Sequence, residues 1–136
     1  MSASIFHEVP IRAKADQVFE MLTEEDKLSS WWLPGSKMKS EVGAVGTFPL
    51  SNGENCIQLR VAELLPNKKV AWDCLEHKFA EWSDTRIEFE IVDDAEGVLL
   101  RFRHSGWKDS SGVFGKTSFY WASLYLMNLK SLLEKG

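Results

Sequence analysis

Apolar and polar side chains alternate along the first residues of the chain, and the period then changes from two to about 3.6. The alternation predicts a strand over residues 5–11 whose inner face carries Ile5, His7, Val9 and Ile11. From residue 14 the spacing is helical, which predicts a helix with Ala15, Val18, Phe19 and Leu22 on its buried face. Thr23 is then expected to cap a second short helix, which Pro34-Gly35 ends.

The period of two returns between residues 38 and 107, where short apolar runs are separated by turn residues. Asn52-Gly53 is a hairpin signal, and Pro66-Asn67 and residues 93–97 mark two further turns. This pattern predicts an antiparallel meander with one core face. Its outer face carries charged residues that we expect to form cross-strand ion pairs, namely Arg86, Glu88, Glu90, Arg101 and Arg103.

The last predicted element is a helix over residues 115–134, which would span roughly 30 Å. On a helical wheel its buried stripe contains Phe119, Ala122, Tyr125, Leu126, Leu129 and Leu133. Only the inner face of the sheet is available to cover such a stripe. The fold class is therefore α+β, and residues 1–136 form a single domain.

Composition narrows the possible functions. Of the 136 residues 44% are hydrophobic and 26% charged, which is typical of a globular domain, and no apolar run could span a membrane. The net charge is −4 and the basic residues are scattered, so nucleic-acid binding is not expected. With no export signal visible, we expect a cytoplasmic protein in which Cys56 and Cys74 remain thiols. The six Trp, eight Phe and two Tyr exceed what a core of this size needs.

Several motifs together identify a family resemblance. They are Trp31-Trp32 after two helices, Gly43-X-X-Gly46, Leu65-Pro66, Trp72, Trp82 and His104-Ser105-Gly106-Trp107 before a helix that ends in Leu132-Leu133-Glu134. In order and spacing the chain resembles the activator of heat-shock-protein ATPase homology family, within the START-like (SRPBCC), birch-pollen-allergen-like superfamily. The resemblance implies a helix-grip fold, in which a curved antiparallel sheet wraps around the C-terminal helix and leaves a cavity between them. The family name also implies a stress response and a chaperone as a possible partner.

The candidate site is this cavity, with an expected volume of roughly 300 Å³ or more. Its walls would be the aromatic and apolar residues that face the interior: Trp32, Phe48, Trp72, Phe89, Phe102, Phe119, Ala122 and Leu126. Ala122 is the smallest of them and would leave room for a ligand between Phe119 and Leu126. His104 is the candidate polar anchor. The alternative interpretation is that the aromatic residues simply pack as core and that His104 is satisfied by the backbone.

Three functions remain open at this point. The first is a non-catalytic domain that binds a small apolar, aromatic or lipid-like ligand. The second is a polyketide-cyclase-like enzyme, for which His104 and Asp73 are the available acid–base groups. The third is a chaperone-associated interaction domain, with Tyr120, Leu124 and Met127 as the exposed contact, which could also join two copies of the chain. Monomer and homodimer are both open. No metal and no cofactor is expected, because His and Cys lack ligand spacing and no phosphate loop follows a strand.

Overall fold

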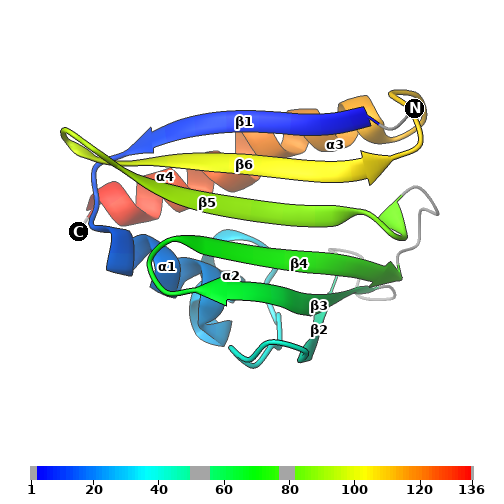
Figure 1. Ribbon diagram of the computed structural model, residues 1–136, viewed down its shortest axis with the longest axis horizontal. Helices are drawn as coiled ribbons and strands as arrows, with labels where there is room; N and C mark the ends of the chain where they lie inside the picture. Colours follow the sequence, from blue (N-terminus) through cyan, green and yellow to red (C-terminus); the bar gives the residue numbers. More distant parts are fainter. Residues whose placement is uncertain (1–2, 50–55, 77–81, 136) are drawn as a thin grey trace.

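The structure is a computed structural model that describes residues 3–49, 56–76 and 82–135. The sheet has six strands, and Figure 1 shows the helices behind it. In chain order the elements are β1 (Ala3–Ile11), α1 (Ala15–Thr23), α2 (Glu25–Trp31), β2 (Val45–Pro49), β3 (Cys56–Leu65), β4 (Lys69–Glu76), β5 (Arg86–Asp94), β6 (Gly97–Trp107), α3 (Phe114–Tyr120), η2 (Trp121–Tyr125) and α4 (Leu126–Lys135). The predicted turn at Asn52-Gly53 lies outside the described residues.

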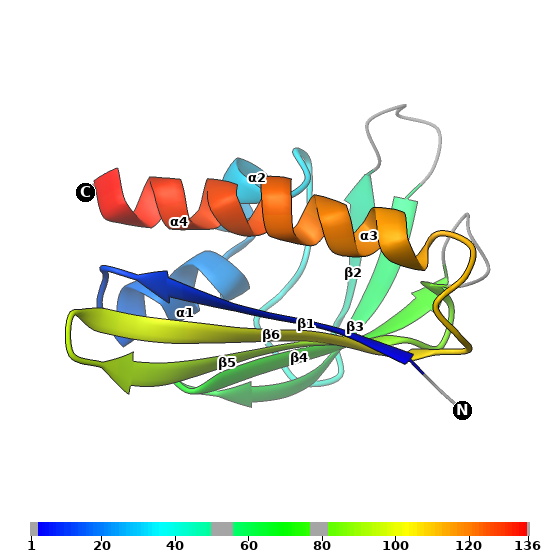
Figure 2. The ribbon, with the colours of Figure 1, turned by 90° about the horizontal axis from the view of Figure 1, so that it is seen from above.

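The strands form one antiparallel sheet in the order β1-β6-β5-β4-β3-β2. Figure 2 shows that α1, α2 and the C-terminal helix all lie on the same side of this sheet. The register of β3 against β4 shifts at two places, and such bulges bend a strand and increase its twist. The predicted α+β helix-grip fold is confirmed, with the C-terminal helix lying across the inner face of the curved sheet.

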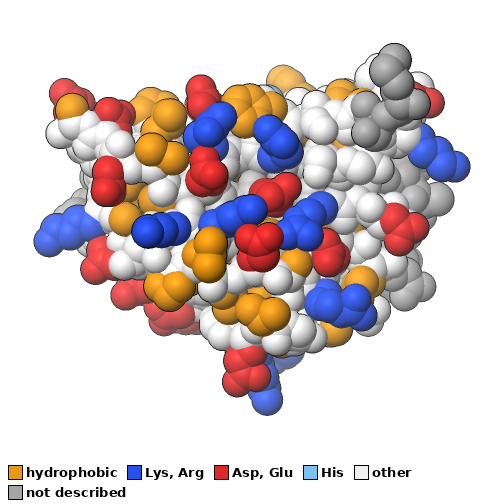
Figure 3. All heavy atoms as spheres, viewed as in Figure 1, with side chains coloured by type: hydrophobic (Ala, Val, Ile, Leu, Met, Phe, Trp, Pro, Cys, Tyr) orange, Lys and Arg blue, Asp and Glu red, His pale blue; other side chains and the backbone are white. Residues whose placement is uncertain are grey.

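Alternation along the strands separates the two faces of the sheet as predicted. The inner face is apolar, and the residues of β5 and β6 that point inward are buried. On the outer face, Arg101 binds Glu8 at 3.0 Å and Glu90 at 3.2 Å, and both carboxylates come from neighbouring strands. The outer face therefore carries basic and acidic groups side by side (Figure 3).

The glycines of the Gly-X-X-Gly motif have structural roles. Gly43 has φ +91°, a left-handed conformation that side chains rarely adopt. At Gly46, a Cβ atom would lie 2.7 Å from the Cβ of Met38 and 2.8 Å from the carbonyl oxygen of Lys37. This part of the family motif is therefore explained by the path of the chain into β2.

The junction of α1 and α2 differs from the prediction. Thr23 does not cap the second helix: it is the last residue of α1, and its hydroxyl donates to the carbonyl of Phe19 at 2.8 Å. Glu24, in an extended conformation, separates the two helices. The hydroxyl of Ser40 donates to the carbonyl of Thr23 at 2.5 Å, so the end of α1 is satisfied by the following loop.

The C-terminal helix contains a π-helical segment that the sequence does not reveal. The backbone N–H of Leu126 donates to the carbonyl of Trp121, five residues earlier, instead of four. One extra residue in a turn rotates everything before it by about 100°. Trp121 is thereby turned into the core, where it is fully buried, while Phe119 is 65% exposed. The prediction that Phe119 faces the sheet is wrong for this reason.

Within the described part of the chain, no helix is both long enough and apolar enough to cross a membrane.

Candidate functional site

Aromatic rings from the sheet and from the helices meet between the two layers. We call this group the aromatic cluster, and it consists of Trp31, Trp32, Phe48, Trp72, Phe89, Phe102 and Trp121. The cluster is continuous across the two layers: the Trp32 ring is stacked on Trp72 with centroids 5.6 Å apart and lies 5.3 Å from Trp121. Phe102 and Trp121 are 4.4 Å apart. Every member is at most 6% exposed.

These rings occupy the space in which we expected a cavity. Open hollows lie instead elsewhere on the described surface, and two of them are large. One of about 240 Å³ lies among charged side chains on the outer face of β5 and β6. The other, of about 310 Å³, lies between the β5–β6 turn and the end of α4. Among the described residues the expected ready-made apolar cavity is not formed, because the aromatic side chains are buried against one another.

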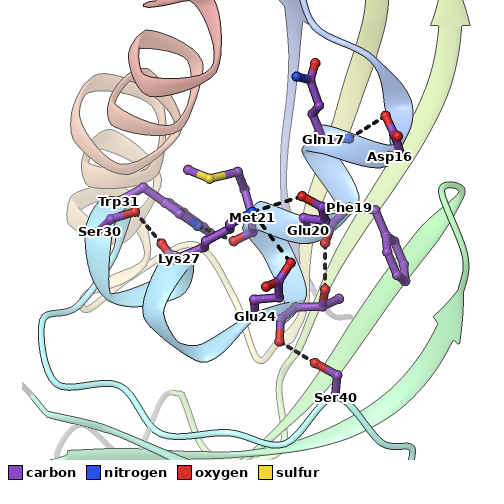
Figure 4. Close-up of polar contacts among 11 residues, drawn as sticks. Asp16, Gln17, Phe19, Glu20, Met21, Glu24, Lys27, Ser30, Trp31 and Ser40 are labelled. Atoms are coloured by element: carbon purple, nitrogen blue, oxygen red, sulfur yellow. Dashed lines mark hydrogen bonds and ion pairs between the residues drawn. The ribbon is translucent and has the colours of Figure 1, made fainter. Parts of the chain in front are cut away.

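The α1–α2 pair holds one edge of the cluster in place. Trp31 lies in the last turn of α2, and its indole N–H donates to the carbonyl of Met21 at 2.7 Å (Figure 4). Trp32 follows directly, and its backbone N–H closes α2 on the carbonyl of Leu28 at 3.0 Å. The hydrogen bond to Met21 thus positions the indole of Trp31, and the end of α2 positions the indole of Trp32.

Three other buried indoles lack such an acceptor. Within the described residues, the Nε1–H groups of Trp72, Trp107 and Trp121 have no hydrogen-bond partner, although all three side chains are at most 1% exposed. Leaving a buried donor unpaired costs about 1–3 kcal/mol. The two members of the aromatic cluster in this group are Trp72 and Trp121, which lie on the sheet and on the helix respectively. The cluster thus contains unused hydrogen-bonding capacity.

His104 is fully buried, as predicted, at the β6 end of the interior. Its Nε2 lies 2.8 Å from the hydroxyl oxygen of Thr85, and that hydroxyl donates its only proton to the carbonyl of Trp82 at 2.6 Å. His104 must therefore carry its proton on Nε2 and donate it to Thr85. The imidazole is also in edge contact with Trp82, with centroids 4.7 Å apart. A side-chain hydroxyl, rather than the backbone, satisfies this nitrogen.

Cys74 lies near the same threonine. Burial raises the pKa of its thiol to about 12, although a hydrogen bond with Thr85 acts in the opposite direction. At neutral pH the sulfur is protonated, and a protonated thiol is a poor nucleophile.

The predicted site residues are only partly brought together. Five of them share the aromatic cluster, namely Trp32, Phe48, Trp72, Phe89 and Phe102, and Leu126 is buried in the same core. Ala122 is half-buried and Phe119 points away from the sheet. Sequence reasoning missed Trp121, because an α-helical wheel places it off the buried stripe. It also missed Thr85, whose contact with His104 comes from the pairing of β5 with β6.

The groups required for the enzymatic alternative lie apart. Asp73 faces the outer side of the sheet, where its carboxylate is 3.5 Å from the guanidinium of Arg86. His104 faces the interior. A reaction that used both groups on one substrate would need them on the same side of the sheet, and the sheet separates them. Among the described residues, no three His, Cys, Asp or Glu side chains gather as a metal site would require.

A six-stranded antiparallel sheet closed on one side by a long C-terminal helix defines a START-like helix-grip domain. The sequence pattern of one family matches residues 12–134. The chain belongs to this family, which is described as activator of Hsp90 ATPase homolog 1-like proteins. The family resemblance identified from the motifs is thus confirmed.

Solved structures show the same architecture. The Aha1 dimer from Colwellia psychrerythraea is 28% identical, with a TM-score of 0.86 over 97% of this chain and 96% of that one. Protein MLL2253 from Mesorhizobium loti is 19% identical, with a TM-score of 0.86 over 98% of each chain. DynU16, a protein in the dynemicin biosynthetic locus, is 17% identical, with a TM-score of 0.80 over 98% of this chain and 48% of that one. Comparison with curated proteins finds no match.

Proposed function

We propose that this domain binds a small planar apolar ligand that carries a hydrogen-bond acceptor, and that the ligand lies in the aromatic cluster under the C-terminal helix. The observation that carries the proposal is the pair of buried indole N–H groups of Trp72 and Trp121, which have no hydrogen-bond partner in the described part of the chain. A carbonyl or ether oxygen would satisfy either of them. Flat rings around the donors suit an aromatic body.

The π-helical segment supports the same proposal. Such segments are rare and frequently occur at functional sites. Here the segment holds Trp121 and Tyr125 against Trp32, at centroid distances of 5.3 and 6.3 Å. Because these rings are in contact, a ligand must separate them in order to enter. We therefore expect binding to alter the signals of several aromatic residues at once.

The test compares two probes, 2-acetylnaphthalene and 2-ethylnaphthalene. They differ only in the carbonyl oxygen of the ketone, which can accept a hydrogen bond. Titration of ¹⁵N-labelled protein gives both dissociation constants and reports directly on the indole N–H signals. We expect the ketone to bind about fivefold more tightly, which corresponds to one hydrogen bond worth roughly 1 kcal/mol. The N–H signal of Trp72 or Trp121 should move downfield with the ketone only.

Matched variants assign the effect to the donors. Trp72→Phe and Trp121→Phe keep an aromatic ring but remove the N–H, so the preference for the ketone should fall in at least one of them. Trp31→Phe is the control, because that indole already donates to Met21. Equal affinities of the two probes in the wild-type protein, or no binding of either, would contradict the proposal. Native mass spectrometry of protein from its own cells then identifies a retained ligand.

A second proposed function is self-association. The similar Aha1 from Colwellia psychrerythraea is a dimer. The present chain also exposes large apolar side chains along its C-terminal helix, including Leu124 at 46% and Met127 at 40% exposure. Sedimentation velocity over a range of concentrations tests this function independently of the ligand: we expect a mass of two chains that declines to one on dilution.

A further inference from the structure

The outward side of the C-terminal helix carries no charge over most of its length. Between residues 117 and 133 the only charged residue is Lys130. Its ammonium group turns aside to the carbonyl of Pro10 at 2.5 Å and to Glu134 at 2.8 Å. In a chain in which 26% of the residues are charged, an uncharged surface over four turns of helix is unusual. Figure 2 shows the sheet on one side of this helix, with α2 beside the helix.

Large apolar side chains stand on this uncharged surface. We call it the outer helix face, and its large apolar members are Phe119 (65% exposed), Tyr120 (39%), Leu124 (46%), Met127 (40%) and Leu132 (40%). Phenylalanine, tyrosine and methionine are enriched in protein interfaces, and charged residues are depleted from their centres. The π-helical segment contributes to this surface, because the same rotation that buries Trp121 turns Phe119 outward.

The face consists of two rows of residues at a spacing of four. One row is Phe119, Ser123, Met127 and Ser131, and the other is Tyr120, Leu124, Asn128 and Leu132. In the first row large side chains alternate with serines. Rows at this spacing form the ridges that interlock when two helices pack, and small residues between large ones leave the grooves.

We propose that the outer helix face is the surface through which two copies of this chain associate, with the two C-terminal helices packed across a twofold axis. This inference rests on the self-association proposed above and names its surface. A twofold contact requires one surface to be complementary to itself, and a row in which Phe119 and Met127 alternate with Ser123 and Ser131 meets that requirement.

Charge favours a second copy over a different partner. Each chain has a net charge of −4, so the association of two copies is opposed least where the contact surface itself adds no like charges. The outer helix face is such a surface. A partner recognised through electrostatic complementarity would instead need charged groups along the face, and between residues 117 and 133 the only charged residue is Lys130, whose ammonium group turns aside to Pro10 and Glu134. Lys116 lies at the edge of the face, with its Nζ 5.7 Å from the centroid of the Tyr120 ring.

The experiment measures the dimer dissociation constant by sedimentation for the wild-type protein, Leu124→Lys and Val92→Lys. Leu124 lies near the middle of the face, so the substitution places two like charges across the axis. We expect dissociation to become easier by on the order of a hundredfold. Val92 is the matched control, because it is 40% exposed but lies on β5, on the outer side of the sheet. Its variant should dimerise like the wild-type protein.

A cross-linking variant provides a second measurement. In a Cys56→Ser background, which removes the exposed native thiol, Leu124→Cys should form a disulfide-linked dimer under mild oxidation. If the wild-type protein is dimeric and Leu124→Lys remains equally dimeric, the outer helix face is not the interface, although self-association stands. If the wild-type protein is monomeric at every concentration, both the proposed self-association and the proposed interface are wrong. Circular dichroism and urea unfolding establish that each variant is folded.

Discussion

The indole rings of Trp32 and Trp72 are nearly parallel, with centroids 5.6 Å apart and an interplanar angle of 7°. Trp32 follows α2, whereas Trp72 stands in the middle of β4, so this stacked pair joins the helical corner to the sheet. Trp121 completes the contact from the C-terminal helix at 5.3 Å. The helix pair, the sheet and the C-terminal helix are therefore packed through one set of rings.

The hydrogen bond of Trp31 should be visible in a comparison of two otherwise similar substitutions. Trp31→Phe and Trp121→Phe each replace a buried indole by a phenyl ring. Only the first breaks a hydrogen bond, the one to the carbonyl of Met21. We expect Trp31→Phe to lower the free energy of unfolding by about 1 kcal/mol more than Trp121→Phe does. Urea unfolding measures both, and an equal or larger loss for Trp121→Phe would contradict the assignment of the donors.

Thr85 should be more important for stability than its size suggests. Thr85→Val has nearly the same shape but removes the acceptor for the Nε2–H of His104. We expect the free energy of unfolding to fall by about 1–3 kcal/mol, since a buried donor loses its partner. Thr85→Ser keeps the hydroxyl and serves as the control, with a smaller loss. If Thr85→Val and Thr85→Ser lower the free energy of unfolding equally, the hydroxyl group does not contribute to stability.

The two cysteines should differ sharply in reactivity. Cys56 is exposed and Cys74 is buried. We expect Ellman's reagent to modify one thiol rapidly in the folded protein and the second only on unfolding. Cys56→Ser should abolish the fast reaction. A rapid reaction of two thiols in the native protein would show that Cys74 is accessible.

The buried thiol of Cys74 also predicts that the stability of the protein falls at alkaline pH. Burial raises the pKa of Cys74 from 9.0 to about 12, so the folded state holds a proton that the unfolded state releases. The resulting stabilisation is complete below pH 9 and is lost as the pH rises toward 12. Cys74→Ala removes this contribution, so we expect its stability to fall less steeply than that of the wild-type protein over this range. Parallel slopes would be the contrary result.

The π-helical segment predicts that one deletion in the C-terminal helix is tolerated. Deleting Ser123 restores α-helical spacing between Trp121 and Leu126 and leaves both facing the core. We expect a melting temperature close to that of the wild-type protein. Deleting Asn128, which is also exposed, rotates Leu129 away from the core. That variant should lose about 2–5 kcal/mol, as when a buried leucine is truncated. Thermal unfolding compares the two, and similar losses would contradict the role of the extra residue.

The sequence by itself determined the sheet and its two faces. In a strand, neighbouring side chains point to opposite sides whatever surrounds them, so alternation alone placed Phe102 and His104 inside and Arg101 outside. The order of motifs then identified the family and the helix-grip fold. These conclusions depend on local geometry or on the linear arrangement of the chain, and both can be read from the sequence.

Only the tertiary structure decided what occupies the interior and which way the first turns of the C-terminal helix face. The hydrogen-bond partners of His104 and Trp31 come from other elements, and no local pattern shows which indoles remain without an acceptor. The extra residue in the π-helical segment likewise has no signal in the sequence, because an α-helical wheel assumes a constant rotation per residue. Packing against Trp32 and Phe102 favours a buried Trp121 over a regular helix, and that choice turns Phe119 toward solvent.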